Sequence, residues 1–181
     1  MTTEATTTSK TPGMITGLFR DKESTERVYR SLRDRGYTDD EINLMMSDKT
    51  RDTQYIVDPH TEIGSKALEG SGVGGAVGGA IGAIIGGIAA IGTNLVLPGL
   101  GLVVWGPIAA ALAGAGAGGL TGGLVGGLIG WGIPEATAKV YEEGIKNGGV
   151  VVGVMPRSAA DADYFADEWR NLYRAEHVNR Q

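Results

Sequence analysis

Hydrophobic and polar positions divide the chain into stretches of different character. The two outer stretches, 13–47 and 134–181, mix charged and apolar residues at helix and strand spacings. Between them, Gly70 to Pro134 contains no charged side chain over 65 residues. The length of 181 residues allows one domain, or one domain with a large insertion. We therefore expect a soluble folded unit that carries an apolar segment of a different kind.

The first outer stretch has the pattern of a strand, a helix and a second strand. The apolar run Met14 to Phe19 predicts a strand, and Ile42 to Met46 predicts another. Between them Asp21 is a candidate N-cap for a helix over Lys22 to Arg35, and Gly36 is suited to end that helix. This half is therefore expected to be a β–α–β unit.

The second outer stretch has a complementary pattern. Pro134 is suited to the first helical position of a helix over Glu135 to Lys146, and Val150 to Val154 predicts a strand. Ser158 with Asp161 has the spacing of a capping box, which predicts a further helix. That helix is expected to end near Arg174, and a short last strand to begin at His177 and Val178.

Folded together, the two halves predict a ferredoxin-like α+β sandwich, a split domain interrupted between its second and third strands. The interruption is expected to be a long glycine-zipper helical hairpin. The expected divisions are a disordered tail over 1–12, the first half of the α+β domain over 13–47, a linker over 48–69, the hairpin over 70–133, and the second half of the domain over 134–181.

Glycines in the middle stretch recur every fourth residue, which places each row on one side of an α-helix. This is the GxxxG pattern that lets helix backbones approach closely. We therefore predict a helix-packing interface at these positions. The residues are Gly74, Gly78, Gly82, Gly86, Gly114, Gly118, Gly122, Gly126 and Gly130.

Two glycine-rich helices are expected, over 72–92 and 107–131, joined by an apolar connector over 93–106 that Pro98, Gly99 and Gly101 break. At about 1.5 Å per residue they would be about 31 and 37 Å long, enough to cross a hydrocarbon core about 30 Å thick. Trp105 and Trp131 fit the pattern of interfacial anchors.

Such helices need apolar neighbours on both sides, because each carries glycines on one face and bulky side chains on the other. In the first, the bulky stripe consists of Val77, Ile81, Ile84, Ile88 and Ile91. Glycine also disfavours an isolated helix by about 1 kcal/mol per residue relative to alanine. A membrane hairpin meets this need, and so does a soluble oligomer whose hairpins bundle together.

Composition limits the kinds of function that the chain can have. The formal net charge is -5 and there is no cysteine, which argues against nucleic-acid binding and leaves no thiolate chemistry. His60 and His177 lie in polar stretches and are expected at the surface. No nucleophile–base pair or ligand cluster stands out. We therefore predict no enzyme, and no catalytic residue, cofactor or metal.

The order of parts resembles the bacterial general stress proteins with a YflT-type, heat-induced stress domain. The resemblance rests on GMITGLFRDKESTERVYRSLRDRGYTDDEINLMMSD at Gly13 to Asp48 and GIPEATAKVYEEGIKNGGVVVGV at Gly132 to Val154. It implies an association with stress and transfers no catalytic residue.

The resulting functional hypothesis is a non-enzymatic, stress-associated protein that self-assembles and associates with the membrane through the hairpin. Its expected partners are itself and membrane lipid, with a protein complex as a further possibility, on the cytoplasmic side of the membrane. The alternative is a soluble cytoplasmic oligomer whose bundled hairpins form an apolar stalk or tube. That structure would anchor an enzyme complex or shelter a lipophilic molecule.

Overall fold

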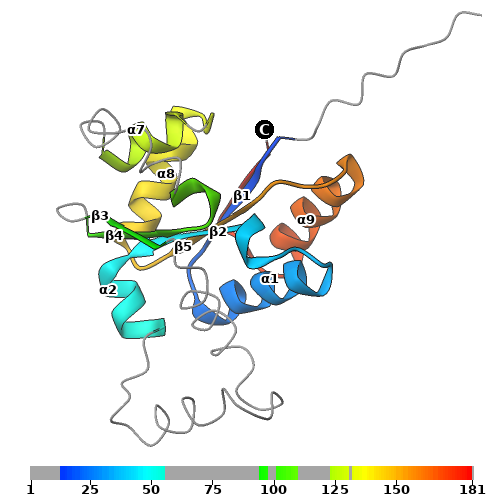
Figure 1. Cartoon of the computed structure of the whole chain (residues 1–181), viewed down its shortest axis with the longest axis horizontal. Coiled ribbons are helices and arrows are strands. Elements are labelled where there is room, and N and C mark those ends of the chain that lie inside the picture. The colour runs from blue at the N-terminus through cyan, green and yellow to red at the C-terminus, as the bar shows by residue number, and fades with distance from the viewer. Residues whose placement is uncertain (1–12, 56–93, 98–100, 110–122, 131, 181) are drawn as a thin grey trace, which may run out of the picture.

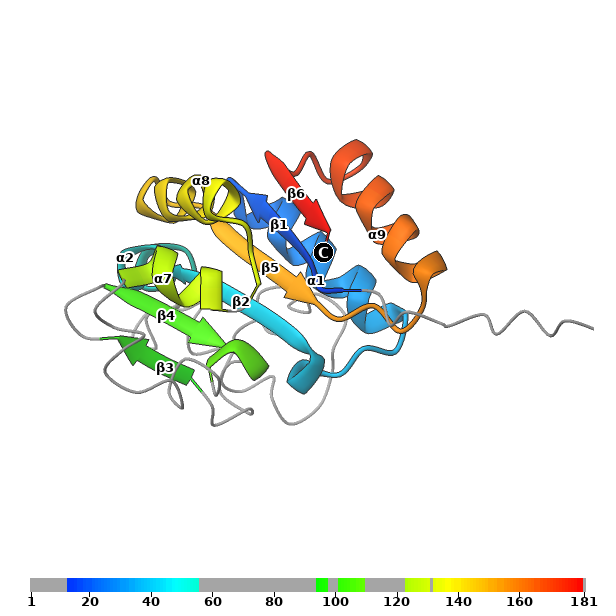
Figure 2. The same ribbon diagram turned by 90° about the horizontal axis from the view of Figure 1, so that it is seen from above.

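The fold is an α+β arrangement built on one antiparallel sheet of six strands. A computed structural model describes residues 13–55, 94–97, 101–109, 123–130 and 132–180 of the chain. The strand order is β3-β4-β2-β5-β1-β6, and every neighbouring pair is antiparallel (Figures 1 and 2). The strands are β1 (Ile15–Phe19), β2 (Ile42–Ser47), β3 (Asn94–Leu97), β4 (Leu102–Trp105), β5 (Val150–Val154) and β6 (His177–Arg180). The predicted α+β class is confirmed.

Helices lie on both faces of this sheet. The longer described helices are α1 (Lys22–Asp34), α7 (Gly123–Gly130), α8 (Glu135–Lys146) and α9 (Ala159–Asn171). Shorter turns are η1 (Asp39–Glu41), α2 (Asp48–Thr50) and η2 (Arg51–Tyr55), and residues 107–109 are helical as well. α1 and α9 pack on one face, here the α1/α9 face, and α7 and α8 pack on the other, the α7/α8 face (Figures 1 and 2).

Strand β5 joins the two outer stretches of the sequence into one unit. It lies between β1 and β2, so that Val154 is the register partner of Ile15 on one side and of Ile42 on the other. All five residues of β5 are buried. β6 then pairs with the free side of β1. The halves before and after the apolar region therefore share one sheet.

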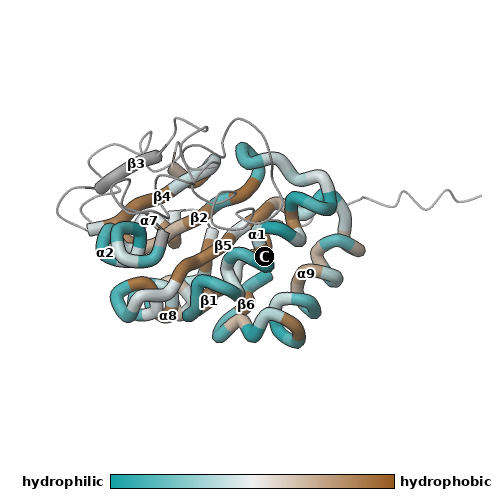
Figure 3. Tube along the Cα trace, turned by 90° about the horizontal axis from the view of Figure 1, so that it is seen from below, coloured by the Kyte–Doolittle hydropathy of each residue, from teal (hydrophilic) through white to brown (hydrophobic). Residues whose placement is uncertain are grey.

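Each face of the sheet has its own apolar core, and the apolar strands β2, β4 and β5 run through the middle of the molecule (Figure 3). On the α1/α9 face the largest buried side chains include Phe19, Tyr37, Trp105, Phe165 and Trp169. On the α7/α8 face they include Met14, Leu18, Met45, Tyr141 and Ile145. Apart from the half-buried Ser47, all residues of the four strands between the two edges are buried.

Local capping signals place the helices where the sequence predicts them. The side chain of Asp21 accepts a hydrogen bond from the N–H of Ser24, and Ser158 accepts one from Asp161. Gly36 has φ +84°, the left-handed conformation that ends α1. Pro134 is the N-cap of α8, one position before the predicted one. The capping side chains of Asp21 and Ser158 therefore mark the residues at which α1 and α9 begin.

The interpretation of 93–106 as an irregular connector between two helices is wrong. Residues 94–97 and 102–105 are strands β3 and β4, and β4 pairs with β2, with Met46 opposite Val103. Gly101, with φ +60°, lies in the turn between them. The segment that was expected at the far tip of a hairpin is therefore part of the sheet.

The second predicted glycine helix is not continuous. Its start at 107–109 and its end at α7 are helical, but Gly123 has φ +64°, which is outside the right-handed helical region. The expected linker is also helical at its start, over α2 and η2. The first predicted helix, over 72–92, and the tail over 1–12 lie outside the described residues.

Candidate functional site

The predicted helix-packing interface lies only partly within the described residues. Gly126 and Gly130 lie on α7. A methyl group at either position would meet no atom of the described structure within 4 Å. Within this part of one chain, the side of α7 that bears these two glycines is therefore open. The other predicted positions, Gly74, Gly78, Gly82, Gly86, Gly114, Gly118 and Gly122, lie outside the described residues.

The second apolar segment, defined here as residues 107–131, is attached to the domain at both ends. Ile108 and Ala109, at its start, are buried in the core of the α7/α8 face. Leu124 and Leu128, on α7 at its end, are buried in the same core. Thirteen residues, 110–122, separate the two attachments. The two described ends of the segment therefore lie on the same face of the sheet.

A buried asparagine fixes the point at which this segment begins. The Oδ1 atom of Asn43 on β2 accepts a hydrogen bond from the backbone N–H of Ile108 at 2.9 Å, and its Nδ2 donates to the carbonyl of Gly153 at 3.2 Å. Gly106 has φ +86°, and a Cβ there would collide with the carbonyl of Ile42. Glycine is thus required at this turn, and Asn43 caps the helical residues that follow it.

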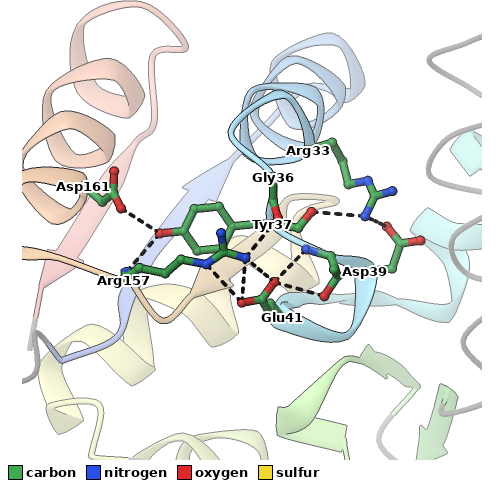
Figure 4. A network of polar contacts seen from close by, with 8 residues as sticks. Arg33, Gly36, Tyr37, Asp39, Glu41, Arg157 and Asp161 are labelled. Atoms are coloured by element: carbon green, nitrogen blue, oxygen red, sulfur yellow. Dashed lines mark hydrogen bonds and ion pairs between the residues drawn. The ribbon is translucent and has the colours of Figure 1, made fainter.

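A polar network joins the two outer stretches at one end of the sheet (Figure 4). The guanidinium of Arg157 lies 4.4 Å from the ring centre of Tyr37 and donates to the carbonyl of Gly36 at 2.9 Å. The Tyr37 hydroxyl accepts from the backbone N–H of Arg157 at 3.0 Å and donates to Asp161 at 3.2 Å. The loop after α1 is therefore bound to the loop before α9.

Glu41 is the acidic centre of this network. Arg157 donates from Nη2 to both oxygens of Glu41, at 2.8 and 3.1 Å. The backbone N–H of Thr38 donates to the same carboxylate at 2.8 Å. This bond, followed by the Arg157 contact, lowers the pKa of Glu41 below its ordinary value, whereas burial raises the pKa of Tyr37. The Thr38–Glu41 spacing is a capping-box signal that the sequence contains and that sequence reasoning missed.

A second polar cluster is buried between β1 and α8. The hydroxyls of Thr16 and Tyr141 are 2.8 Å apart. Both side chains are buried, and burial raises the pKa of Tyr141 to about 12. The ring of His177 on β6 packs edge-on against Tyr141, with its Nε2 3.4 Å from the hydroxyl of Thr137. His177 is half-buried, more enclosed than expected from the polar stretch around it.

The tryptophan predicted as an interfacial anchor is a core residue. Trp105 is 1% exposed on β4 and belongs to the core of the α1/α9 face, so the anchor interpretation of this residue is wrong. Trp131 and His60 lie outside the described residues. In the described part of the chain, three or more His, Asp and Glu side chains do not come together as a candidate metal site. None of the described helices combines the length and the hydropathy of a membrane span.

The two polar networks described above connect segments that are far apart in the sequence. The Tyr37–Arg157–Glu41 network links the two outer stretches, and Asn43 links β2 and β5 to the start of the second apolar segment.

Comparison of the chain with protein-family models, with curated proteins and with solved structures finds no match.

Proposed function

We propose that this chain is a non-enzymatic protein that assembles with further copies of itself through its glycine-rich apolar segments. In this proposal a ferredoxin-like split domain, formed by β1, β2, β5 and β6 with α1 and α9, is the platform that carries the segments. The observation that carries it is the attachment of the second apolar segment at both ends to one face, through Ile108 and Leu128. The four-residue glycine spacing then provides a surface for close helix contact.

The position of β4 supports one of the two forms of assembly that the sequence left open. A hairpin that spans a bilayer would place residues 94–105 on the far side, and here β4 pairs with β2 in the sheet. A straight helix over 110–122 would also be only about 20 Å long, less than the ~30 Å core of a bilayer. These two points favour the oligomer in which apolar segments pack against one another.

Membrane association is the second candidate, favoured by the 65 uncharged residues from Gly70 to Pro134. In that case the segments would enter one leaflet rather than cross it. The stress association remains a prediction that rests on the quoted sequence resemblance alone.

Sizing the full chain by light scattering without detergent tests the proposal. We expect a defined oligomer that Gly78→Leu and Gly122→Leu each disrupt, because a leucine forces the helix backbones apart. Ala76→Leu is the matched control, since position 76 lies between the glycine row and the bulky stripe of the predicted helix. A chain that stays monomeric, or an oligomer unchanged in both glycine variants, contradicts the proposal. Flotation with phosphatidylethanolamine–phosphatidylglycerol vesicles would identify the membrane form.

A further inference from the structure

The sheet extends beyond the two helices on its α1/α9 face. The principal contacts of α1 and α9 with the sheet are made to β1, β5 and β6. β2 and β4 follow beyond β5 in the strand order. In Figure 2 they lie on the side of the molecule away from α9. On this face, β2 and β4 therefore lie beyond the strands that α1 and α9 mainly contact.

The side chains that β2 and β4 place on this face are large, apolar and buried. Met46 and Val103 are 0% exposed and Trp105 is 1% exposed. Leu44 is the fourth member of this group, which we name the β2–β4 patch. The buried Nε1 of Trp105 has no hydrogen-bond acceptor in the described part of the chain. The patch is therefore buried although it lies beyond the principal contacts of α1 and α9.

The chain between η2 and β3 begins and ends beside this patch. It comprises the 38 residues 56–93. At its start, the carbonyl of Gln54 in η2 accepts a hydrogen bond from Nζ of Lys22 at 2.7 Å, which places η2 beside the first turn of α1. At its end, β3 pairs with β4. A segment of this length, attached at both sides of the patch, can reach all of it.

We propose that the bulky stripe of residues 70–92 covers the β2–β4 patch of its own chain. The stripe, Val77, Ile81, Ile84, Ile88 and Ile91, needs an apolar neighbour, and the patch is an uncharged surface of matching character. The glycine row of the same predicted helix then faces away from the sheet, where a second copy can contact it. This last step rests on the proposed function, whereas the covering of the patch does not.

Single cysteines test the proposal, because the natural chain has none. Val103 and Val104 are neighbours on β4, both 0% exposed, and they belong to the cores of opposite faces. Val103→Cys and Val104→Cys therefore form a matched pair. In the full chain we expect both thiols to react with a maleimide at least about a hundredfold more slowly than in urea, because access requires local opening.

A second change removes the proposed cover. Replacing Ile81, Ile84 and Ile88 by serine is expected to expose the thiol at 103 and to leave the thiol at 104 protected. Rapid reaction at 103 in the chain with its isoleucines overturns the proposal. Protection at 103 that is lost on dilution to the monomer, or that requires vesicles, also overturns it, because a second copy or a bilayer would then be the cover.

Oxidation provides a direct readout that does not depend on the serine variant. With Val103→Cys combined in turn with Ile81→Cys, Ile84→Cys and Ile88→Cys, we expect at least one disulfide at the mass of a single chain. Disulfides only at the mass of two chains, or none with any of the three, overturn the proposal. Gly78→Leu separates it from the proposed function, because that variant should abolish the oligomer and leave the thiol at 103 protected.

Discussion

The side-chain amide of Asn43 on β2 holds the backbone N–H of Ile108, 65 residues later in the chain, at 2.9 Å. The same side chain donates to the carbonyl of Gly153 on β5. Asn43 is 2% exposed, so neither group has water as an alternative partner. One residue thus connects two central strands with the start of the second apolar segment.

Asn43→Ala is expected to lower the free energy of unfolding by about 1–3 kcal/mol, the cost of leaving buried polar groups without partners. Urea denaturation followed by circular dichroism measures the change. Asn171→Ala at the exposed end of α9 is the control and should have little effect. An Asn43→Ala chain as stable as the control would show that the cap contributes nothing to stability.

Tyr141→Phe is expected to reduce the loss of stability at alkaline pH. The pKa of Tyr141 in the folded chain, about 12, lies above the ordinary value of about 10, so the folded state favours the protonated phenol. The stabilisation is complete below pH 10 and is lost as the pH rises towards 12. Urea midpoints between pH 9 and pH 12 test this, with the exposed Tyr164→Phe as control. Parallel pH curves for Tyr141→Phe and the parent chain would contradict the prediction.

Glu41→Gln is expected to weaken the dependence of stability on acid pH. The pKa of Glu41 is lower in the folded chain than its ordinary value, because Thr38 and Arg157 donate to the ionised carboxylate. That contribution is present above the unfolded pKa of about 4.3 and disappears as the pH falls through the folded value. The effect is small, because both side chains of the Glu41–Arg157 pair are partly exposed. The neighbouring exposed Asp40→Asn is the control, and equal slopes for both variants below pH 5 would refute the prediction.

Gly144→Ala on α8 is expected to destabilise the fold by about 1–3 kcal/mol, the usual cost of overpacking a core. A Cβ at this position would collide with the side chain of Leu18, including Cδ1 at 2.7 Å. Helix propensity alone predicts the opposite sign, a gain of about 1 kcal/mol. Thermal or urea unfolding decides between them. Leu18→Val in the same chain should restore part of the lost stability, because it makes room for the methyl group.

Sequence reasoning succeeded where local chemistry decides structure. The N-caps at Asp21 and Ser158 and the left-handed glycine at Gly36 are read from neighbouring residues, and the elements that they bound were predicted. The apolar run Val150 to Val154 predicted a strand from its own residues, and all five of them are buried. Its position between β1 and β2 agrees with the strand order of the predicted ferredoxin-like arrangement.

The hairpin of β3 and β4 was not predicted, because strands are hard to recognise within a uniformly apolar sequence. Residues 94–105 read NLVLPGLGLVVW, two runs of strand formers around a Pro-Gly turn. Because the surrounding stretch is equally apolar, the contrast that normally marks a buried strand was absent. The polar contacts between Tyr37 and Arg157 could not be predicted either, because they join residues 120 positions apart.

The place of β5 between β1 and β2 sets the order in which the protein can be completed on the ribosome. β2 ends at Ser47 and β5 ends at Val154, so 107 further residues (154 minus 47) must be made after β2 before β5 is complete. At about 5–20 residues per second, β1 and β2 wait roughly 5–20 s for the strand that fills the gap between them. The uncharged stretch from Gly70 to Pro134 is synthesised within that interval, before the sheet is complete. We therefore expect the nascent chain to expose apolar surface until β5 is made.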